Sequence, residues 1–178
     1  MKKIVQRDDK VLRQIVKEIP VKEITTPKIK KIIKEMSTAL RSQNDGVALA
    51  APQIGYSLPI FVVSGKIFHE DFLRGGAEIK KIPPKELPKD LVFINPKMSK
   101  LSREKEWLPE GCLSVRWFYG NTLRSKKATV TAYDENGKKF IKGASGLLAQ
   151  IFQHETDHLN GILFVDHAKD IKEELPNK

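Results

Sequence analysis

The segment Gln153–Leu159 carries two histidines, His154 and His158, four residues apart, with Glu155 directly after the first. On an α-helix the two imidazoles lie one turn apart on the same face, where they can bind one metal ion. Glu155 projects about 100° around the helix from His154, close enough to reach a water held by that metal. The H-E-x-x-H pattern is typical of metal-assisted hydrolases, and it requires this segment to be helical.

A catalytic metal of this kind needs a third protein ligand and an open position for water. The only cysteine of the chain is Cys112, which lies within the segment Leu108–Val115. A lone cysteine cannot form an intramolecular disulfide, and most such cysteines are small buried apolar residues. One cysteine with two histidines is nevertheless a known catalytic metal set. Cys112 is therefore a candidate third ligand, although spacing alone does not establish the pairing.

A further segment, Asp45–Gly55, reads Asp-Gly-Val-Ala-Leu-Ala-Ala-Pro-Gln-Ile-Gly and resembles the first signature of peptide deformylases. Residues 110–115, Glu-Gly-Cys-Leu-Ser-Val, resemble the second motif of that family, and residues 153–159 resemble the third. The motifs follow the family's order and spacing, and the resemblance extends from Val11 to Phe164. On these motifs the chain is identified as a member of the peptide deformylase family. Such hydrolases remove the formyl group from formylmethionine at the start of newly synthesised polypeptides and release formate.

The resemblance implies a set of site residues. One divalent metal ion would be held by Cys112, His154 and His158. Fe2+ is the ion expected in the cell, and Zn2+ or Ni2+ are alternatives for the isolated protein, because raw affinity favours zinc. Metal-bound hydroxide would attack the formyl carbon, with Glu155 as general acid and base. The side-chain amide of Gln53 and the backbone N–H of Leu113 would stabilise the charge that develops on the formyl oxygen.

Substrate binding is also implied by the resemblance. Gly46, Val47 and Ala48 resemble the family's edge strand, which pairs with the backbone of an extended peptide. The methionine side chain would enter an apolar pocket that includes Val47, Leu147 and Ile151. For Leu147 and Ile151 an ordinary core position is an equally good interpretation, since burial alone does not discriminate between the two.

Two positions depart from the family pattern. Ala48 stands where the family has a glycine, and its methyl group could narrow the mouth of the pocket. Arg116 stands where many members have proline, and it is followed by the aromatic run 117–119. That run either faces the substrate or covers the core. We expect activity to survive both changes, with an altered preference at the second substrate residue.

Glu110 and Arg124 resemble a carboxylate–guanidinium pair that braces the cysteine loop of the family. The alternative is an ordinary exposed ion pair, which would contribute only about 0–1 kcal/mol to stability. The sequence does not decide between these two interpretations.

The predicted elements indicate an α+β fold. Asp8 and Asp9 could cap a short helix through Val16, and Thr26-Pro27 opens a longer helix with proline in its first turn. The apolar residues of that longer helix follow a spacing of three and four, which predicts one buried face; they are Ile29, Ile32, Ile33, Met36 and Leu40. Buried strands are predicted over residues 59–63 and 91–94.

The second half of the chain contains a predicted hairpin and the metal-binding helix. Residues 128–133 alternate as a half-exposed strand, residues 134–137 form a turn, and residues 138–141 return as the partner strand. Ser145 is the expected cap of the metal-binding helix, which should run to about Asn160 with Gly161 as its terminator. Five apolar residues predict that this helix is largely buried: Leu147, Leu148, Ile151, Phe152 and Leu159.

The resemblance implies a single domain over residues 1–178, with antiparallel sheets packed around a central metal-binding helix. Residues 65–90 contain a Gly-Gly pair and three prolines, which predict an irregular surface insertion. A chain of this length can bury a core of reasonable size as one domain.

The net charge of +10, from 32 basic and 22 acidic residues, raises the question of nucleic-acid binding. The lysines are scattered and lack interleaved aromatic residues that stack on bases, so a solvated surface is favoured and specific DNA binding is not expected. Because deformylases act on nascent chains, weak association with the ribosome is a secondary hypothesis. Apolar runs fall short of the ~20 residues that span a bilayer, and the first residues lack a signal-peptide pattern. We therefore expect a cytoplasmic, bacterial-type enzyme, with an organellar origin left open.

Two other functional classes compete with this interpretation. An H-E-x-x-H endopeptidase would take its third ligand from a downstream residue such as Asp166 or His167. It would leave Cys112 and the Gln53 segment unexplained. A catalytically silent binding protein with the same fold is the second alternative, since fold does not imply function. The intact metal-binding pattern argues against it.

Overall fold

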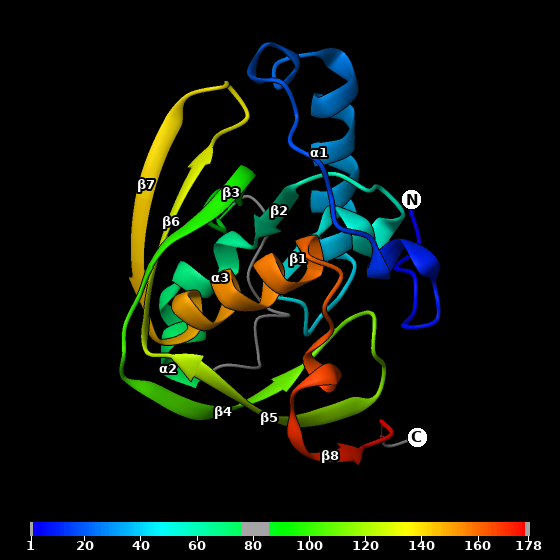
Figure 1. The fold of residues 1–178 in the computed structure, drawn as a ribbon, viewed down its shortest axis with the longest axis vertical. Helices are drawn as coiled ribbons and strands as arrows, with labels where there is room; N and C mark the ends of the chain where they lie inside the picture. The colour runs from blue at the N-terminus through cyan, green and yellow to red at the C-terminus, as the bar shows by residue number, and fades with distance from the viewer. Residues whose placement is uncertain (1, 76–85, 177–178) are drawn as a thin grey trace.

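The computed structural model describes residues 2–75 and 86–176, which form two antiparallel sheets and three α-helices (Figure 1). The larger sheet has the strand order β1-β2-β3-β6-β7 and the smaller sheet β4-β5-β8. In chain order the elements are α1 (Pro27–Arg41), β1 (Ala48–Ala50), β2 (Ile60–Val63), α2 (Glu70–Gly75), β3 (Leu91–Leu101), β4 (Lys105–Gly111), β5 (Phe118–Ser125), β6 (Lys127–Tyr133), β7 (Lys139–Ser145), α3 (Gly146–Leu159) and β8 (Lys169–Glu173). Short 3-10 helices span Lys10–Arg13, Val21–Glu23, Ala51–Ile54, Gly65–Phe68 and Phe164–Asp166.

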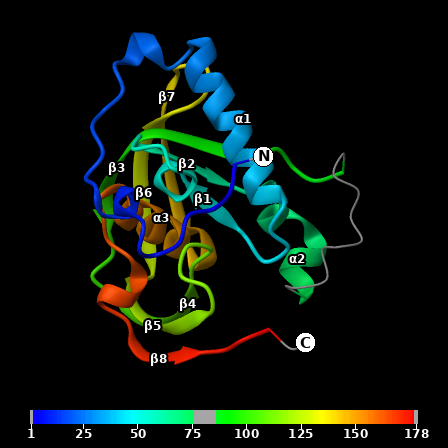
Figure 2. The same cartoon turned by 90° about the vertical axis from the view of Figure 1, so that its right-hand side faces the viewer.

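Strand β2 is buried on both faces, as its continuous apolar run predicts. Ile60 and Val62 pack in one apolar cluster with residues of α1, whereas Phe61 and Val63 pack in a second cluster with residues of α3. Successive side chains of a strand point to opposite faces, so a strand covered on both sides needs apolar residues at every position. Figure 2 shows α1 on the near side of the large sheet and α3 beyond β1 and β2.

Helix α3 crosses the middle of the molecule and packs against strands of both sheets (Figure 1). Its main anchor in the large sheet is Phe152, which is fully buried. The Phe152 ring meets the ring of Phe93 edge-on, with centroids 5.1 Å apart, and Phe93 stacks on Phe61 at 4.6 Å. Edge-on and offset stacks are the favoured arrangements of aromatic rings, so this cluster fixes the position of the helix that carries the H-E-x-x-H pattern.

The predicted α+β class with antiparallel sheets is confirmed. Helix α1 begins at Pro27 after Thr26, and its predicted apolar face is buried throughout. The hairpin is formed by β6 and β7, paired from Lys127 with Ser145 to Tyr133 with Lys139. Strand β3 is longer than predicted because it continues past Ile94 to pair with β6.

Several local predictions differ from the structure. The N-terminal helix is only the 3-10 turn Lys10–Arg13; Asp9 caps it by accepting from the Val11 N–H at 3.0 Å. Ser145 precedes α3 but makes no side-chain capping hydrogen bond. The helix does end before Gly161, whose φ of 72° lies in the left-handed region that glycine tolerates. Leu147, predicted to be buried, is 40% exposed.

The segment 65–90 was predicted to be irregular, and its first part is not. Residues Gly65–Phe68 form a 3-10 helix and Glu70–Gly75 form α2. The remainder of the predicted insertion includes residues 76–85, which lie outside the described residues. Among the helices of the described segments, none is both long enough and apolar enough to cross a membrane.

Replacing Phe152 by alanine should lower the free energy of unfolding by about 3–5 kcal/mol, because it opens a cavity between α3 and the large sheet. Urea denaturation monitored by circular dichroism measures the change. The matched control is Ile141→Ala on β7, where the replaced side chain is 71% exposed. This substitution should lower the free energy of unfolding by no more than about 0.5 kcal/mol. Equal losses in the two variants would contradict the proposed role of the aromatic cluster.

Candidate active site

The structure brings Cys112, His154 and His158 together, with one potential ligand atom from each residue within 4.8 Å of the others. The histidine rings lie one turn apart on α3 with centroids 4.9 Å apart. Cys112 directly follows β4, and its Sγ lies 3.3 Å from Nε2 of His158. A thiolate and two imidazoles suit Zn2+ or Fe2+, and three protein ligands leave a position open. The residues therefore fit a catalytic metal ion.

Glu110 holds His154 in its orientation. The Nδ1–H of His154 donates to Oε2 of Glu110 at 3.1 Å, because an ionised carboxylate can only accept. This leaves Nε2 of His154 for the metal, an arrangement that fixes the tautomer of a histidine ligand. Burial opposes the charged form of His154, but hydrogen bonds to Cys112 and Glu110 outweigh it and raise its pKa.

Glu110 is itself paired with Arg124 in the protein interior. The guanidinium donates to both carboxylate oxygens, from Nε at 2.7 Å and from Nη2 at 2.9 Å. Nη1 of Arg124 donates to Oδ2 of Asp157 on α3 at 2.7 Å. Burial acts to raise the pKa of Glu110, but the hydrogen bonds from His154 and Arg124 outweigh it and hold the pKa far below its usual range. With side-chain exposures of 3% for Glu110 and 6% for Arg124, the pair is not the exposed ion pair of the alternative interpretation.

Glu155 differs from Glu110, because within residues 2–75 and 86–176 no counter-charge is bonded to it. The residue is 4% exposed, and its Oε2 has no hydrogen-bond partner among the residues that the structure describes. Burial raises the pKa of Glu155 to about 7, since desolvation disfavours the charged form. A buried carboxyl group without a partner is costly in a folded protein and is common where a proton must be transferred.

Gln53 lies in the 3-10 helix that follows β1, and it is 1% exposed. Its Oε1 accepts from the Ala50 N–H at 2.8 Å, which fixes the amide so that Nε2 points the other way. Nε2 lies 3.2 Å from Oγ of Ser114 and 3.5 Å from Sγ of Cys112. The side chain thus presents N–H donors next to the candidate metal ligands.

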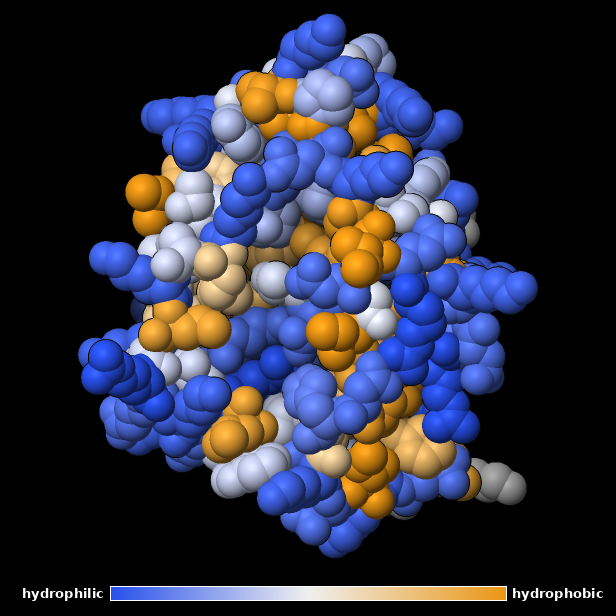
Figure 3. All heavy atoms as spheres, in the orientation of Figure 1, coloured by the Kyte–Doolittle hydropathy of each residue, from blue (hydrophilic) through white to orange (hydrophobic). Residues whose placement is uncertain are grey.

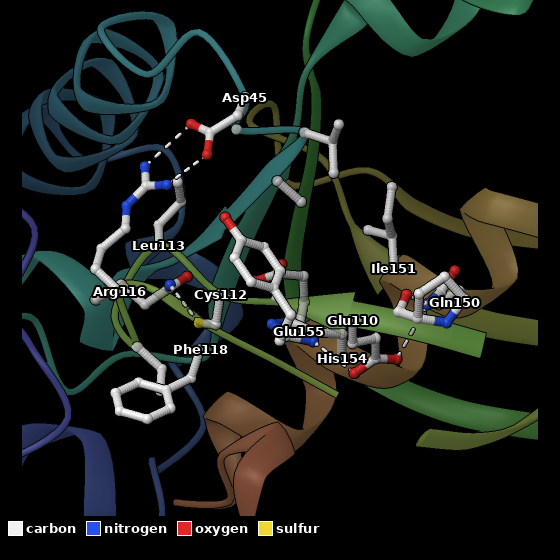
Figure 4. Close-up of a pocket in the computed structure, with 18 of the residues that line it drawn as sticks. Asp45, Glu110, Cys112, Leu113, Arg116, Phe118, Gln150, Ile151, His154 and Glu155 are labelled. Carbon is white, nitrogen blue, oxygen red and sulfur yellow. Dashed lines mark hydrogen bonds and ion pairs between the residues drawn. The ribbon is translucent and has the colours of Figure 1, made fainter. Parts of the chain in front are cut away.

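These residues surround a cavity of about 320 Å³. Of the residues predicted to act in catalysis or binding, those that line it are Gly46, Val47, Ala48, Gln53, Cys112, Leu113, Leu147, Ile151, His154 and Glu155. His158 lies behind the lining and is 1% exposed. In Figure 4, Asp45 and Arg116 lie on one side of the cavity and Ile151 on the other, with Cys112, His154 and Glu155 between them. The aromatic residues 117–119 also line the cavity.

Strand β1 presents an open backbone edge. Val47 directs its carbonyl to β2, where it accepts from the Ser64 N–H at 2.8 Å. In an antiparallel pair, residues alternately direct their backbone groups toward the partner strand or away from it. Ala48 and Ala50 therefore face away from β2, and the Ala50 N–H does bond the Gln53 side chain instead. Because β1 is the last strand of its sheet, the N–H and C=O of Ala48 can pair with another chain.

The structure does not support a third metal ligand from Asp166 or His167. Asp166 accepts two hydrogen bonds from Arg13, at 2.5 and 3.1 Å, and another from the Leu163 N–H at 2.8 Å. Nε2 of His167 lies 3.4 Å from Oδ2 of Asp157, and His167 does not line the cavity. The group that can hold a metal in the described residues contains Cys112 instead.

Three residues around the site were missed in the sequence. Gln150 donates from Nε2 to the carbonyl of Pro109 at 2.9 Å, Asp157 pairs with Arg124, and Ser114 contacts Gln53. The first two could have been found from helical spacing, since Gln150 precedes His154 by four residues and Asp157 follows it by three.

A sequence model of the family described as Polypeptide deformylase matches residues 1–174. The peptide deformylase of Carboxydothermus hydrogenoformans is 41% identical over 169 residues, which cover 95% of this chain and 94% of the relative. The chloroplastic peptide deformylase 1A of Solanum lycopersicum is 40% identical over 174 residues, 93% of this chain and 59% of the relative. The solved structure of a class I type b peptide deformylase of Acinetobacter baumannii bound to Met-Ala-Ser is 27% identical, with a TM-score of 0.76, and the match covers 92% of this chain and 96% of that one.

Replacing Arg124 by methionine should lower the free energy of unfolding by about 3–5 kcal/mol, because it leaves the Glu110 charge buried without its partner. Urea denaturation of the metal-free protein measures the loss. The control is Lys126→Met, which breaks an ion pair with Glu104 whose side chains are 42% and 69% exposed. That change should cost at most about 1 kcal/mol. A loss of this small size in Arg124→Met would show that the buried pair does not hold the site together.

Proposed function

Because the chain belongs to the polypeptide deformylase family, as its three motifs predict, we propose that its cavity removes the formyl group from formylmethionine at the start of nascent polypeptides. Family membership makes the chain an enzyme of the metal-dependent amidase class, and deformylation is the family's known function. The observation that carries the proposal is the buried, unpartnered carboxylate oxygen of Glu155 beside the Cys112, His154 and His158 group. A proton-transfer group next to a metal-binding group is what hydrolysis of an amide needs.

Cys112, His154 and His158 are the proposed metal ligands. A divalent ion held by them supplies Lewis acidity for the formyl carbonyl and lowers the pKa of water. Fe2+ is the proposed ion in the cell, with Zn2+ or Ni2+ as substitutes in isolated protein. The Glu110 carboxylate keeps His154 in the ligand orientation, so the chain prepares the site before any ion binds.

Glu155 is the proposed general acid and base. It accepts a proton from the attacking water as the new C–O bond forms at the formyl carbon, and it delivers that proton to the departing amine as the C–N bond breaks. The products are formate and a free N-terminal methionine. Burial supports both transfers, because a carboxyl group with a pKa near neutrality can bind and release a proton at small cost.

The negative charge that develops on the formyl oxygen needs preorganised donors. We assign this role to the Nε2 amide of Gln53 and the backbone N–H of Leu113. The Gln53 amide is fixed by the Ala50 N–H, so its donors do not have to reorganise during the reaction. Leu113 follows Cys112 directly and lines the same cavity.

The substrate would bind as an extended strand along β1. The outward N–H and C=O of Ala48 pair with the peptide backbone, and Gly46 and Val47 continue that edge. The methionine side chain enters the apolar side of the cavity formed by Val47, Leu147 and Ile151. The partial exposure of Leu147 supports a pocket position over a core position, because an exposed apolar side chain in the cavity lining is available to contact the substrate. A bound Met-Ala-Ser peptide in the relative from Acinetobacter baumannii supports a product of this class.

Removing the acid/base group should abolish turnover. We expect Glu155→Ala to lower kcat for release of formate from a formyl-Met peptide by about 10²–10⁴-fold, after anaerobic loading with Fe2+ and with metal content unchanged. The isosteric Glu155→Gln variant should lose as much, since it retains the size of the side chain but not its proton-transfer group. Wild-type rates in metal-loaded Glu155→Gln would overturn the assignment. Equal or faster turnover after loading with Zn2+ would overturn the choice of iron.

We further propose that the enzyme is of the bacterial cytoplasmic type and associates weakly with ribosomes. The relatives include a bacterial enzyme and a chloroplastic one. Bacteria and chloroplasts both start translation with formylmethionine. The net charge of +10 favours attraction to ribosomal RNA. Hydrophilic residues cover most of the face shown in Figure 3, and hydrophobic residues occur there in small separate groups.

Cosedimentation with purified ribosomes tests the association. We expect binding at low salt that weakens steeply between about 50 and 200 mM salt, because binding to phosphates releases counterions. Binding that is absent at low salt, or that does not respond to salt, would contradict the electrostatic proposal.

A further inference from the structure

An ion pair lies at one side of the cavity mouth. Arg116 donates from Nη2 to Oδ1 of Asp45 at 3.0 Å, and its Nη1 contacts the other carboxylate oxygen. The same guanidinium donates to Oε1 of Gln43 at 3.1 Å and lies 4.6 Å from the centroid of the Trp117 ring. Hydrogen bonds from Arg116 hold the pKa of Asp45 below its usual range. Both members of the pair line the cavity, and Asp45 is the more accessible, with 54% of its side chain exposed against 19% for Arg116.

The second substrate residue would meet this pair. An extended peptide points successive side chains to opposite sides. Since the methionine side chain is assigned to the side of Ile151, the side chain of the following residue points to the opposite side, where Figure 4 shows Arg116 and Asp45. Asp45 immediately precedes the Gly46 edge, so the pair lies beside the path of the backbone that leaves the cavity.

A third charge approaches the same loop from behind. Lys66 is 8% exposed, and its Nζ donates to the carbonyl of Asn44 at 3.1 Å. It attracts the Asp45 carboxylate but is withdrawn from the cavity, whose lining does not include it. The charge that faces the cavity mouth is therefore the balanced sum of Asp45 and Arg116, with a buried positive charge behind them.

We infer that Asp45 and Arg116 form a charge-compensated wall that lets the enzyme accept acidic and basic residues alike after formylmethionine. This inference rests on the proposed deformylase function. Loss of either member exposes the charge of the other, so single neutralisations create charge selectivity of opposite sign. Asp45→Asn favours a glutamate at the second substrate position, and Arg116→Gln favours a lysine there. The Asp45→Asn effect is the larger, because Lys66 then adds to the unpaired Arg116.

The test compares kcat/KM for three C-terminally amidated peptides, formyl-Met-Ala-Ala, formyl-Met-Lys-Ala and formyl-Met-Glu-Ala, so that no peptide carboxylate interferes. We expect a Lys-to-Glu ratio within about twofold of unity in the wild type. The ratio should shift by about tenfold in opposite directions in the two variants, because the charge left unpaired attracts one of the two substrate side chains and repels the other at a partly exposed site. Both shifts should collapse in 0.5 M NaCl, where exposed charges are screened; a purely structural defect would not respond to salt.

The controls carry the same charge changes outside the cavity. Glu104→Gln and Lys126→Gln neutralise an exposed pair that does not line the cavity, and they should leave the ratio unchanged. Arg116→Lys retains the charge without the bidentate geometry and should retain the wild-type ratio. Thermal melting verifies that each variant is folded, and if Arg116→Gln does not fold, Asp45→Asn alone decides the sign.

Three outcomes are distinct. Ratios that move in opposite directions and respond to salt support the inference. A wild type that is active on formyl-Met-Ala-Ala while the ratios of all variants match its own would overturn the inference and leave the deformylase proposal intact. A folded, metal-loaded wild type that releases no formate from any of the peptides would overturn the proposed function, and the inference with it.

Discussion

The buried chain of charges from Arg124 through Glu110 to His154 is the interaction on which the rest of the site depends. It joins three elements that are separate in sequence: β5 supplies the guanidinium, β4 the carboxylate and α3 the imidazole. A buried charge is costly unless it is paired and hydrogen-bonded. Each charged group in the chain therefore needs its hydrogen-bond partners to stay buried. Arg124 also donates to Asp157 on the next turn of α3. These hydrogen bonds fix the position of the small sheet relative to α3, so that Cys112, one residue past β4, lies next to His158.

The protein interior shifts the pKa values of two buried glutamates, Glu110 and Glu155, in opposite directions. Hydrogen bonds from His154 and Arg124 overcome burial and lower the pKa of Glu110. Glu155 has no bonded counter-charge among the described residues, and burial raises its pKa to about 7. Environments that separate the pKa values of neighbouring acids assign them different tasks. Glu110 stays ionised as a structural acceptor, and Glu155 is left able to exchange a proton. Glu155 follows His154 directly and is buried on α3, the helix that Phe152 packs against Phe61 and Phe93 of the large sheet.

The sequence predicted the helices and strands whose apolar residues recur at a regular spacing. The buried face of α1, the doubly covered strand β2 and the hairpin of β6 and β7 all follow from apolar spacing. It also predicted the family, because three motifs in fixed order are more specific than any one of them. It did not predict that residues 65–75 form a 3-10 helix and α2, since the glycines and prolines farther along that segment dominate a local interpretation. The exposure of Leu147 and the pairing of Arg116 with Asp45 could not be predicted either, because each depends on long-range packing: Arg116 meets a residue 71 positions earlier in the chain.

Besides the Gln53 side chain, two contacts link the β1 segment to the loop of Cys112, and these contacts differ in kind. Gly46 lacks a side chain where a Cβ would lie 3.0 Å from the Leu113 side chain and 3.1 Å from that of Gln43. The edge strand thus packs directly against the loop that supplies the proposed oxyanion donor, and a larger residue at position 46 would push the two apart. A few residues away, Arg116 makes the second link by charge and hydrogen bonds to Asp45 and Gln43. A steric contact fixes the separation of two segments, while a bidentate ion pair fixes their relative orientation. Together they allow a short strand of three residues, with few ladder hydrogen bonds of its own, to present a defined backbone edge to a peptide.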